Sequence, residues 1–337
     1  MDHKESPQDQ INAIIGLFSS GQTQEALDAI DALIKDYPNE PLLFNIGGVF
    51  YKQTGQLDEA IKRFEKAITI NPDYAEAHNN LGVTLQNLGL MDEAIASYKK
   101  AITSNPDYAE AHNNLGVTLQ NLGLMDEAIA SYKKAITSNP DYAEAHNNLG
   151  NIFKELEQLD AAVKSYEKVS AINPDYPEAH YNLGNTLVEL GQLEDATKSY
   201  EKVIAINPNY PEAHYNLGNT LVELGQLEDA NKSYEKVIAI NPNYPEAYFN
   251  LGSSLQQLGK LDQAIKCYEK AISIRPNYSG AYYNLSYLKK YIASDPQISK
   301  MQSLLSSDNI TQSDRIDLYF ALAKVNENLD NQDELFK

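Results

Sequence analysis

The sequence predicts an all-α protein built from short antiparallel helix pairs stacked one after another. Three observations predict this class. The chain has an internal 34-residue repeat, the repeat has helix-stop and helix-start signals at fixed places, and its apolar positions have helical spacing. Residues 75–108 recur without a change at 109–142, and residues 177–210 differ from 211–244 only at Thr197 and Asn231. Weaker copies in the same register complete eight tandem units between residues 7 and 278, at 7–40, 41–74, 143–176 and 245–278.

Each unit contains the signals of two helices. The first helix is expected to run for about fourteen residues and to stop at Leu-Gly, as at Gly89, because glycine readily takes the left-handed conformation after a helix end. Acidic residues such as Asp92 and Glu93 then open the second helix, where the helix dipole favours them. Asn-Pro-Asp/Asn-Tyr closes the unit as a turn. Several units restart with proline at the first helical position, at Pro177, Pro211 and Pro245.

The apolar spacing explains why the pairs must stack. Repeat positions 4, 7, 8 and 11 share one stripe of the first helix at about 100° per residue. Gly82 and Ala94 are small, where two helices must approach closely. A single helix pair cannot bury this stripe, so neighbouring pairs are expected to form a continuous core.

The positions that recur with this spacing resemble the tetratricopeptide repeat (TPR). The resemblance covers residues 7–278 and implies antiparallel helix pairs wound into a right-handed superhelical solenoid with a concave groove. Departures are modest; for example, Val169 replaces the third small residue. The residues that carry the resemblance in one unit are His78, Leu81, Gly82, Ala94, Tyr98, Ala101 and Pro106.

Positions 2, 6, 9 and 13 of the first helix lie opposite the core stripe, and position 6 is asparagine in seven successive units. Helix formation does not favour asparagine, whereas its amide can donate and accept hydrogen bonds. The row is therefore predicted to hold the backbone of an extended peptide, and it resembles the asparagine ladder of O-linked N-acetylglucosamine transferases. Copying of one residue by recent duplication is the alternative. The row comprises Asn80, Asn114, Asn148, Asn182, Asn216, Asn250 and Asn284.

Beside this row, position 5 changes from asparagine to an aromatic residue toward the C-terminus. Aromatic side chains offer large contact area at low entropic cost, so these rings are further candidates for peptide contact. Packing against a neighbouring helix is the alternative. Position 2 is glutamate in six units, which would bias the face toward cationic ligands. The aromatic candidates are Tyr181, Tyr215, Phe249 and Tyr283.

Composition narrows the partners and excludes several classes of chemistry. The net charge is −20, with 27 basic and 47 acidic residues, so nucleic acids and anionic membrane surfaces are poor partners. The single cysteine, the acidic N-terminus and the absence of a long apolar stretch indicate a cytoplasmic protein. No catalytic motif or cofactor-binding loop occurs. Histidines such as His78 recur 34 residues apart, too far to share a metal ion, so packing is the preferred interpretation.

After residue 278 the period weakens into a degenerate repeat and a helical extension, residues 279–337. A first helix is expected over 279–292, with further helices starting at Asp295-Pro296 and at Thr311. This part resembles the junction region of bacterial proteins that fuse such repeats to a sulfotransferase domain. Leu335-Phe336 would begin another helix, which suggests that the natural protein continues. The resemblance rests on Leu288-Lys289, Asp295-Pro296, Met301, Leu304-Leu305, Asp314-Arg315 and Phe320-Ala321-Leu322.

Three functions therefore stay open at the level of sequence. The first is a scaffold that binds a partner protein or an extended peptide in its groove. The second is the non-catalytic repeat region of a larger, sulfotransferase-like enzyme. The third is a self-assembly module, because near-identical repeats can stack end to end into homo-oligomers.

Overall fold

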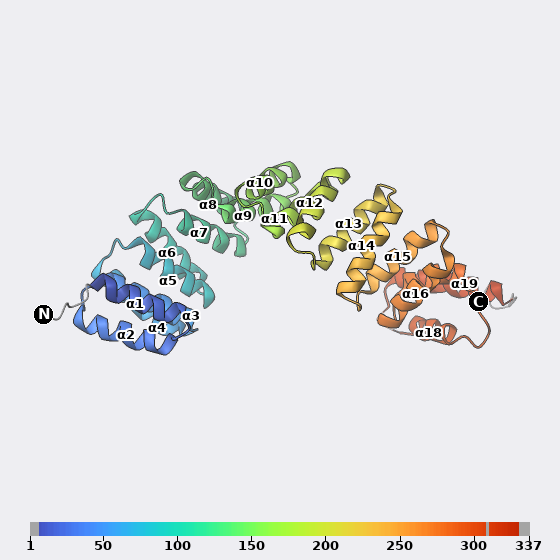
Figure 1. Ribbon diagram of the computed structural model, residues 1–337, viewed down its shortest axis with the longest axis horizontal. Helices are drawn as coiled ribbons and strands as arrows, with labels where there is room; N and C mark the ends of the chain where they lie inside the picture. Colours follow the sequence, from blue (N-terminus) through green and yellow to red (C-terminus); the bar gives the residue numbers. More distant parts are fainter. Residues whose placement is uncertain (1–6, 308–309, 330–337) are drawn as a thin grey trace. The chain divides into compact units, whose positions relative to one another are not determined.

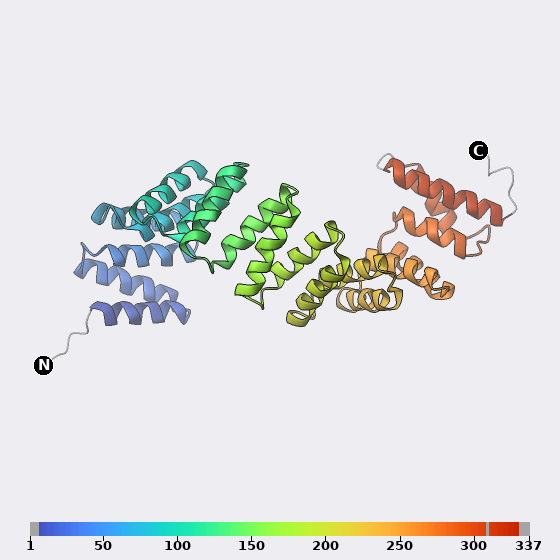
Figure 2. The same ribbon diagram turned by 90° about the horizontal axis from the view of Figure 1, so that it is seen from above.

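The computed structural model describes residues 7–307 and 310–329. These residues form nineteen α-helices and no strand, as the ribbon views show (Figures 1 and 2). The prediction of an all-α fold of paired helices is confirmed. The chain divides into two compact units, Met1–Pro174 and Asp175–Lys337, which are described separately.

The first unit contains five helix pairs, each made of a 13-residue and a 14-residue helix. The helices of the pairs are α1 (Pro7–Ser19) and α2 (Thr23–Asp36), α3 (Pro41–Gln53) and α4 (Leu57–Ile70), α5 (Ala75–Asn87) and α6 (Met91–Ser104), α7 (Ala109–Asn121) and α8 (Met125–Ser138), and α9 (Ala143–Glu155) and α10 (Leu159–Ile172).

The second unit contains three more pairs and a less regular end. Its helices are α11 (Pro177–Glu189) and α12 (Leu193–Ile206), α13 (Pro211–Glu223) and α14 (Leu227–Ile240), α15 (Pro245–Gln257) and α16 (Leu261–Ile274), and then α17 (Ser279–Leu288), α18 (Pro296–Leu305) and α19 (Gln312–Asn328).

In the pairs from α3–α4 to α15–α16, a glycine on the first helix packs against an aromatic ring on the second. A Cβ added at Gly82 would lie 2.6 Å from the ring of Tyr98, and one at Gly218 would lie 2.6 Å from the ring of Tyr234. Both tyrosine rings are essentially inaccessible to solvent. The close approach predicted at Gly82 is therefore present, and the ring fills the space that a side chain would otherwise take.

The predicted helix-stop signal also holds, with one instructive exception. Gly89 has φ +79° and Gly225 has φ +73°, the left-handed conformation expected after a helix end. At the same repeat position the chain has Glu157, which adopts φ +57° although it carries a side chain. A non-glycine residue there costs about 1–2 kcal/mol, so the surrounding helices α9 and α10 impose this turn.

The first helices of successive pairs lie on the inner side of each unit. In the first unit α3, α5, α7 and α9 each contact the next one along, and in the second unit α11, α13 and α15 do the same. The second helices of successive pairs lie farther apart, so the stack curves toward the first helices within each unit. We call the exposed surface of these first helices the inner face; it carries repeat positions 2, 6, 9 and 13, and in the second unit also position 5.

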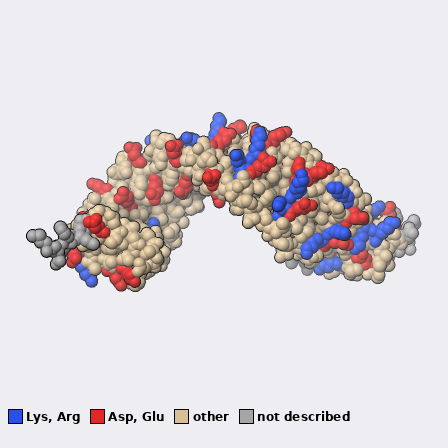
Figure 3. Space-filling view, viewed as in Figure 1, with Lys and Arg blue, Asp and Glu red and all other residues tan. Residues whose placement is uncertain are grey.

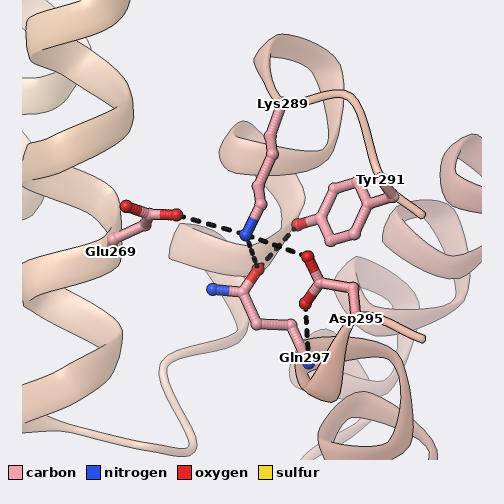
Figure 4. A network of polar contacts seen from close by, with 5 residues as sticks. All are labelled: Glu269, Lys289, Tyr291, Asp295 and Gln297. Carbon is pink, nitrogen blue, oxygen red and sulfur yellow. Dashed lines mark hydrogen bonds and ion pairs between the residues drawn. The ribbon is translucent and has the colours of Figure 1, made fainter. Parts of the chain in front are cut away.

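The end of the second unit departs from the repeat. Helix α17 stops at Leu288 rather than at the expected residue 292, and it packs against α19 while α18 lies to one side. Lys289 is extended there, and its ammonium contacts Glu269 (3.2 Å), Asp295 (3.0 Å) and Gln297 (3.3 Å), as Figure 4 shows. Because these contacts hold the side chain of Lys289 while its backbone is extended, the helix ends at Leu288.

The two helix starts predicted in the extension are confirmed. Asp295 accepts a hydrogen bond from the backbone N–H of Gln297, and Pro296 occupies the first helical position of α18. Thr311 caps α19 by accepting from the N–H of Asp314, as in a capping box. The predicted helix at Leu335-Phe336 falls outside the described residues.

Candidate functional site

In the first unit, the asparagines of the row donate to one another across neighbouring helices. Nδ2 of Asn80 donates to Oδ1 of Asn45 (3.0 Å), and Nδ2 of Asn114 donates to Oδ1 of Asn79 (3.0 Å). Nδ2 of Asn148 donates in the same way to Asn113 (3.1 Å). Each bond joins position 6 of one repeat to position 5 of the repeat before it. The row therefore ties the first helices together as well as facing outward.

The position-5 asparagines extend this network to the glutamates at position 2. Nδ2 of Asn79 donates to Glu110 (3.2 Å), and Nδ2 of Asn113 donates to Glu144 (3.0 Å). Asn79 and Asn113 are fully buried. A charged acceptor strengthens such a bond, so these amides are well satisfied inside the stack.

In the second unit, the same row bonds to different partners. Asn216 donates to the Tyr181 hydroxyl (3.1 Å) and to Oδ1 of Asn185 (2.9 Å). Asn250 repeats the pattern with Tyr215 (3.0 Å) and Asn219 (2.9 Å). Asn185 and Asn219 also accept from the buried hydroxyls of the core tyrosines one helix away, at 2.7 and 2.8 Å. The position-9 asparagines, Asn185 and Asn219, are the centre of this network.

The two networks leave different hydrogen-bonding capacity on the inner face. A primary amide has two N–H donors and an acceptor oxygen. Asn114 uses one N–H and keeps the second, whereas Asn216 uses both. Among the described residues, none donates to Oδ1 of either amide, so both rows still present acceptors. Asn148 uses one N–H, like Asn114, and Asn250 uses both, like Asn216. Asn182 is half-buried, and Asn284 donates to the Tyr268 hydroxyl (3.3 Å).

The position-5 aromatic rings are half-buried and pack within the chain. Tyr181 lies 5.3 Å from Tyr210 and 6.1 Å from Tyr200, measured between ring centroids. Phe249 and Tyr215 make the equivalent pairs in their repeats. Tyr283 differs, because it contacts Tyr287 (5.1 Å) and Phe320 (6.4 Å) at the end of the unit. The four rings thus make the packing contacts of the alternative interpretation and remain partly exposed to solvent.

Tyrosines at repeat position 34, which the sequence suggested only as turn residues, belong to the same surface. Tyr210 has a raised pKa because it is buried beside Tyr181 and near the carboxylates of Glu212 and Glu178. Tyr244 shows the same with Tyr215 and its flanking glutamates. Ring and carboxylate therefore alternate along the inner face of the second unit.

The last regular repeat adds a cation to this arrangement. Arg275 forms an ion pair with Glu246, and its guanidinium carbon lies 5.1 Å from the ring centroid of Tyr278. All earlier units of the array from residue 41 on carry asparagine at this repeat position, as at Asn207 and Asn241. The replacement of this asparagine by Arg275 is the feature of the sequence that could have indicated the contact.

Charge is divided between the helices of a pair. Helices α5, α7, α11, α13 and α15 contain glutamate and no lysine or arginine. Their partners carry the basic residues, several in i,i+3 pairs such as Lys198–Asp195 (2.8 Å). Figure 3 shows basic and acidic side chains interspersed over the second unit on the face in view. The inner face is thus acidic, whereas the second helices balance their charge.

The histidines and the cysteine have structural surroundings. Nε2 of His78 lies 2.8 Å from the carbonyl oxygen of Pro72, and His112 and His214 make the same contact with the preceding turn. Burial raises the pKa of the Cys267 thiol to about 11, which leaves it protonated at neutral pH. No group of three or more potential metal ligands occurs within residues 7–307 and 310–329.

The described helices include none with the length and apolar character needed to cross a lipid bilayer. Two shallow pockets of about 520 and 450 Å³ lie between successive second helices, away from the inner face. Both are lined at equivalent repeat positions, by His78 and Lys100 in one and by His112 and Lys134 in the other.

Family models match most of the repeat region. One described as "TPR repeat" matches residues 47–89, 91–123, 125–156, 150–189, 184–225 and 218–259, which together exceed half of the chain. Another, described as "Tetratricopeptide repeat", matches residues 245–278. A search of curated proteins gave no match.

Solved structures of the same architecture resemble this chain. YrrB, titled a TPR protein with an unusual peptide-binding site, is 26% identical over 56% of this chain and 96% of its own, with a TM-score of 0.52. PilF of Pseudomonas aeruginosa (22% identity, 64% and 97% coverage, TM-score 0.51) shares the fold. The C-terminal part of a TPR protein from Cytophaga hutchinsonii also shares the fold. It is 18% identical over 72% of this chain and 99% of its own, with a TM-score of 0.59. These matches give no support to the sulfotransferase-fusion or glycosyltransferase resemblance.

Proposed function

We propose that this chain, which belongs to the tetratricopeptide repeat family, is a scaffold that binds an extended segment of a partner protein along its inner face. Proteins of this family generally bind proteins or peptides, and YrrB is titled as a peptide binder. The described residues supply hydrogen-bonding groups and aromatic edges on the inner face, and no catalytic domain is evident among the matches. Binding without chemistry is the function that fits these features.

The amide oxygens of the asparagine row carry the proposal. In Asn114, Asn148, Asn216 and Asn250 the amide is held by its N–H group, so its oxygen is fixed in direction and keeps its capacity to accept a hydrogen bond. A fixed acceptor loses little entropy when it accepts from a peptide N–H. Because successive repeats present the same atom, the row suits a ligand with a regular backbone, which is an extended chain.

The experiment compares two pairs of substitutions against a library of twelve-residue labelled peptides. Asn114→Ala with Asn148→Ala tests the first unit, and Asn216→Ala with Asn250→Ala tests the second. Each pair is expected to weaken the best-binding peptides about tenfold, because two hydrogen bonds worth about 0.5–1.5 kcal/mol each are lost. Circular dichroism should show unchanged helicity.

A matched control places the change on the outside of the stack. Lys99→Ala with Lys133→Ala alters exposed residues of α6 and α8 and should leave peptide affinity unchanged. The proposal is wrong if no peptide in the library binds, or if the lysine variants reduce binding as much as the asparagine variants.

One observation favours a second candidate, self-assembly through the end of the second unit. Helix α19 exposes Ile316 (47%), Tyr319 (57%) and Phe320 (57%) on its surface. Large exposed apolar side chains on neighbouring positions commonly mark contact surfaces. Light scattering over a concentration series tests it; Phe320→Ser should reduce any dimer, and a monomer at every concentration excludes this candidate.

A further inference from the structure

The second unit contains one guanidinium site that the chain fills itself. Arg275 forms an ion pair with Glu246 and lies over the ring of Tyr278, which in turn packs at 5.0 Å against Phe249. Carboxylate and aromatic face are the two groups that bind a guanidinium best at a protein surface. We call this set, Glu246, Arg275 and Tyr278, the filled rung.

Two sets of the same residues occur in the preceding repeats without the cation. Glu212 and Tyr244 occupy the repeat positions of Glu246 and Tyr278, and Glu178 and Tyr210 occupy them one repeat earlier. Tyr244 packs at 5.3 Å against Tyr215, and Tyr210 packs at 5.3 Å against Tyr181. We call these two sets the open rungs, because they carry the carboxylate and the supported ring at the repeat positions of the filled rung.

In the open rungs an asparagine stands at the repeat position of Arg275, and its side chain bonds to the backbone of the turn. Asn207 and Asn241 stand at the repeat position of Arg275, and Oδ1 of each accepts a hydrogen bond from the backbone two residues on (3.2 and 3.1 Å). No lysine or arginine among residues 7–307 and 310–329 forms an ion pair with Glu178 or Glu212, and both glutamates are exposed. Each open rung therefore keeps a carboxylate beside a ring that is fixed by its aromatic neighbour.

The first unit lacks this arrangement although it shares the glutamates. There, position 5 is asparagine, and its amide binds the carboxylate of the next repeat, as Asn79 does with Glu110 and Asn113 with Glu144. The carboxylates are thus shared within the stack, and none of the ring pairs among the described residues includes Tyr74, Tyr108 or Tyr142. The feature is specific to the second unit.

We infer that the two open rungs bind arginine side chains of the partner segment, each guanidinium paired with Glu178 or Glu212 and stacked on Tyr210 or Tyr244. This inference rests on the proposed peptide-binding function and specifies its ligand as a basic, arginine-bearing extended segment. Neighbouring packed helices lie about 10 Å apart. A chain extended in the polyproline II conformation advances about 3.1 Å per residue and turns once in three residues, so two arginines three residues apart would point to the same side at about this spacing.

The test uses labelled twelve-residue peptides that contain Arg-Ala-Ala-Arg in a neutral background, measured by fluorescence anisotropy with the whole chain. Citrulline peptides are the control, because citrulline keeps the shape of arginine and removes its charge. Arginine peptides are expected to bind at least tenfold tighter than citrulline peptides. The difference should shrink at high salt, since exposed charges are screened.

Substitutions within the rungs make the assignment specific. Glu178→Gln and Glu212→Gln keep the side-chain shape and should each weaken arginine-peptide binding three- to tenfold, with no effect on citrulline peptides. Asn241→Arg copies the filled rung into the neighbouring repeat and should weaken binding similarly by occupying the site. Arg275→Asn should open a third rung and strengthen binding two- to fivefold.

The outcomes separate this inference from the function on which it rests. Equal affinity for arginine and citrulline peptides, or an Asn241→Arg variant that binds as the unaltered chain does, would overturn the arginine rungs and leave a peptide scaffold standing. Failure of every library peptide to bind would contradict the scaffold itself.

Discussion

The two units share one core and differ in how their inner faces are bonded. In the first, asparagine at position 6 donates to asparagine at position 5 of the repeat before it, as Asn114 does with Asn79. In the second, Asn216 donates to a tyrosine hydroxyl and to Asn185, which also accepts from the buried Tyr200 hydroxyl. In the first unit the Tyr98 hydroxyl donates instead to Gln86 (2.9 Å).

This difference teaches that the core and the inner face vary independently. In the six pairs from α5–α6 to α15–α16 the glycine, alanine and tyrosine are the same, whereas positions 5 and 9 vary: they are asparagine and valine at residues 79 and 83, asparagine at both 147 and 151, and tyrosine and asparagine at 181 and 185. Where position 5 is tyrosine, the position-9 asparagine accepts from the position-6 amide of the next repeat, as Asn185 does from Asn216. The inner face can therefore change its ligand chemistry without rebuilding the stack.

The largest expected effect tests the shared core. Gly82→Ala in the first unit and Gly218→Ala in the second should each destabilise the protein by about 2–3 kcal/mol, since the new Cβ would overlap a buried tyrosine ring. Urea unfolding with hydrogen exchange should place the loss in the altered repeat of either unit.

Gly16→Ala is the control for these variants. No atom lies within 4 Å of a Cβ at Gly16, and this helical glycine has no positive φ. The change should stabilise α1 by about 0.5–1 kcal/mol through helix propensity. A loss in one unit only would show that the two cores differ after all.

The next prediction converts a repeat of the first unit into the pattern of the second. Asn79→Tyr and Val83→Asn should each destabilise the protein, because either change alone leaves buried polar groups with too few partners. The double variant should be about 1 kcal/mol more stable than the sum of the single effects, since Asn114 and Tyr98 regain the partners seen in the second unit. Additive single effects, measured by urea unfolding, would refute the linkage of positions 5 and 9.

A smaller change in stability is expected from exchanging the one residue at which two repeats of the second unit differ. Asn231 is buried and its Oδ1 has no hydrogen-bond partner among the described residues, whereas the Thr197 hydroxyl donates to the carbonyl of Glu194 (2.7 Å). Asn231→Thr should stabilise the protein by about 1–2 kcal/mol by removing an unsatisfied acceptor. Thr197→Asn is the reciprocal change and should cost a similar amount. Thermal unfolding of both variants decides the point, and shifts of the same sign would contradict it.

The smallest effect concerns acid sensitivity at the end of the second unit. Hydrogen bonds from Ser279 and Thr311 lower the pKa of the Asp314 carboxyl below its usual value. A lowered folded-state pKa stabilises above the unfolded value, near 4, and this contribution is lost as the pH falls through the lower folded value. The protection factors of the α19 amides against hydrogen exchange should therefore decrease at pH values below about 4. Asp314→Asn should remove that dependence, and an unchanged acid response in this variant would contradict the assignment.

Sequence reasoning predicted the fold well because the repeat states its own constraints many times. The stop at Gly89, the small residue at Gly82 and the buried ring at Tyr98 are each dictated by local geometry or volume, and all three agree with the structure. The early end of α17 was not predictable, because the contacts of Lys289 with Glu269 of the preceding helix and with Asp295 depend on the tertiary structure.

The candidate site was predicted only in outline. Periodicity places positions 5 and 6 on the first helix of each unit, but it does not show that Asn114 and Asn79 of successive units bond to each other. Nor does it show that Tyr210 and Tyr244, placed in turns, pack against the inner-face rings. Such contacts depend on the offset between successive helix pairs, which a sequence pattern leaves unspecified.

The identity of residues 75–108 and 109–142 has a consequence for how this protein can change over time. If residues 109–142 were lost by recombination, Asn148 and Glu144 would meet Asn79 with the same atoms that Asn114 and Glu110 present now. Every junction would be restored, and the array would shorten by one whole step. Loss or duplication of this repeat would therefore shorten or lengthen the inner face in whole steps of 34 residues while the same contacts are kept.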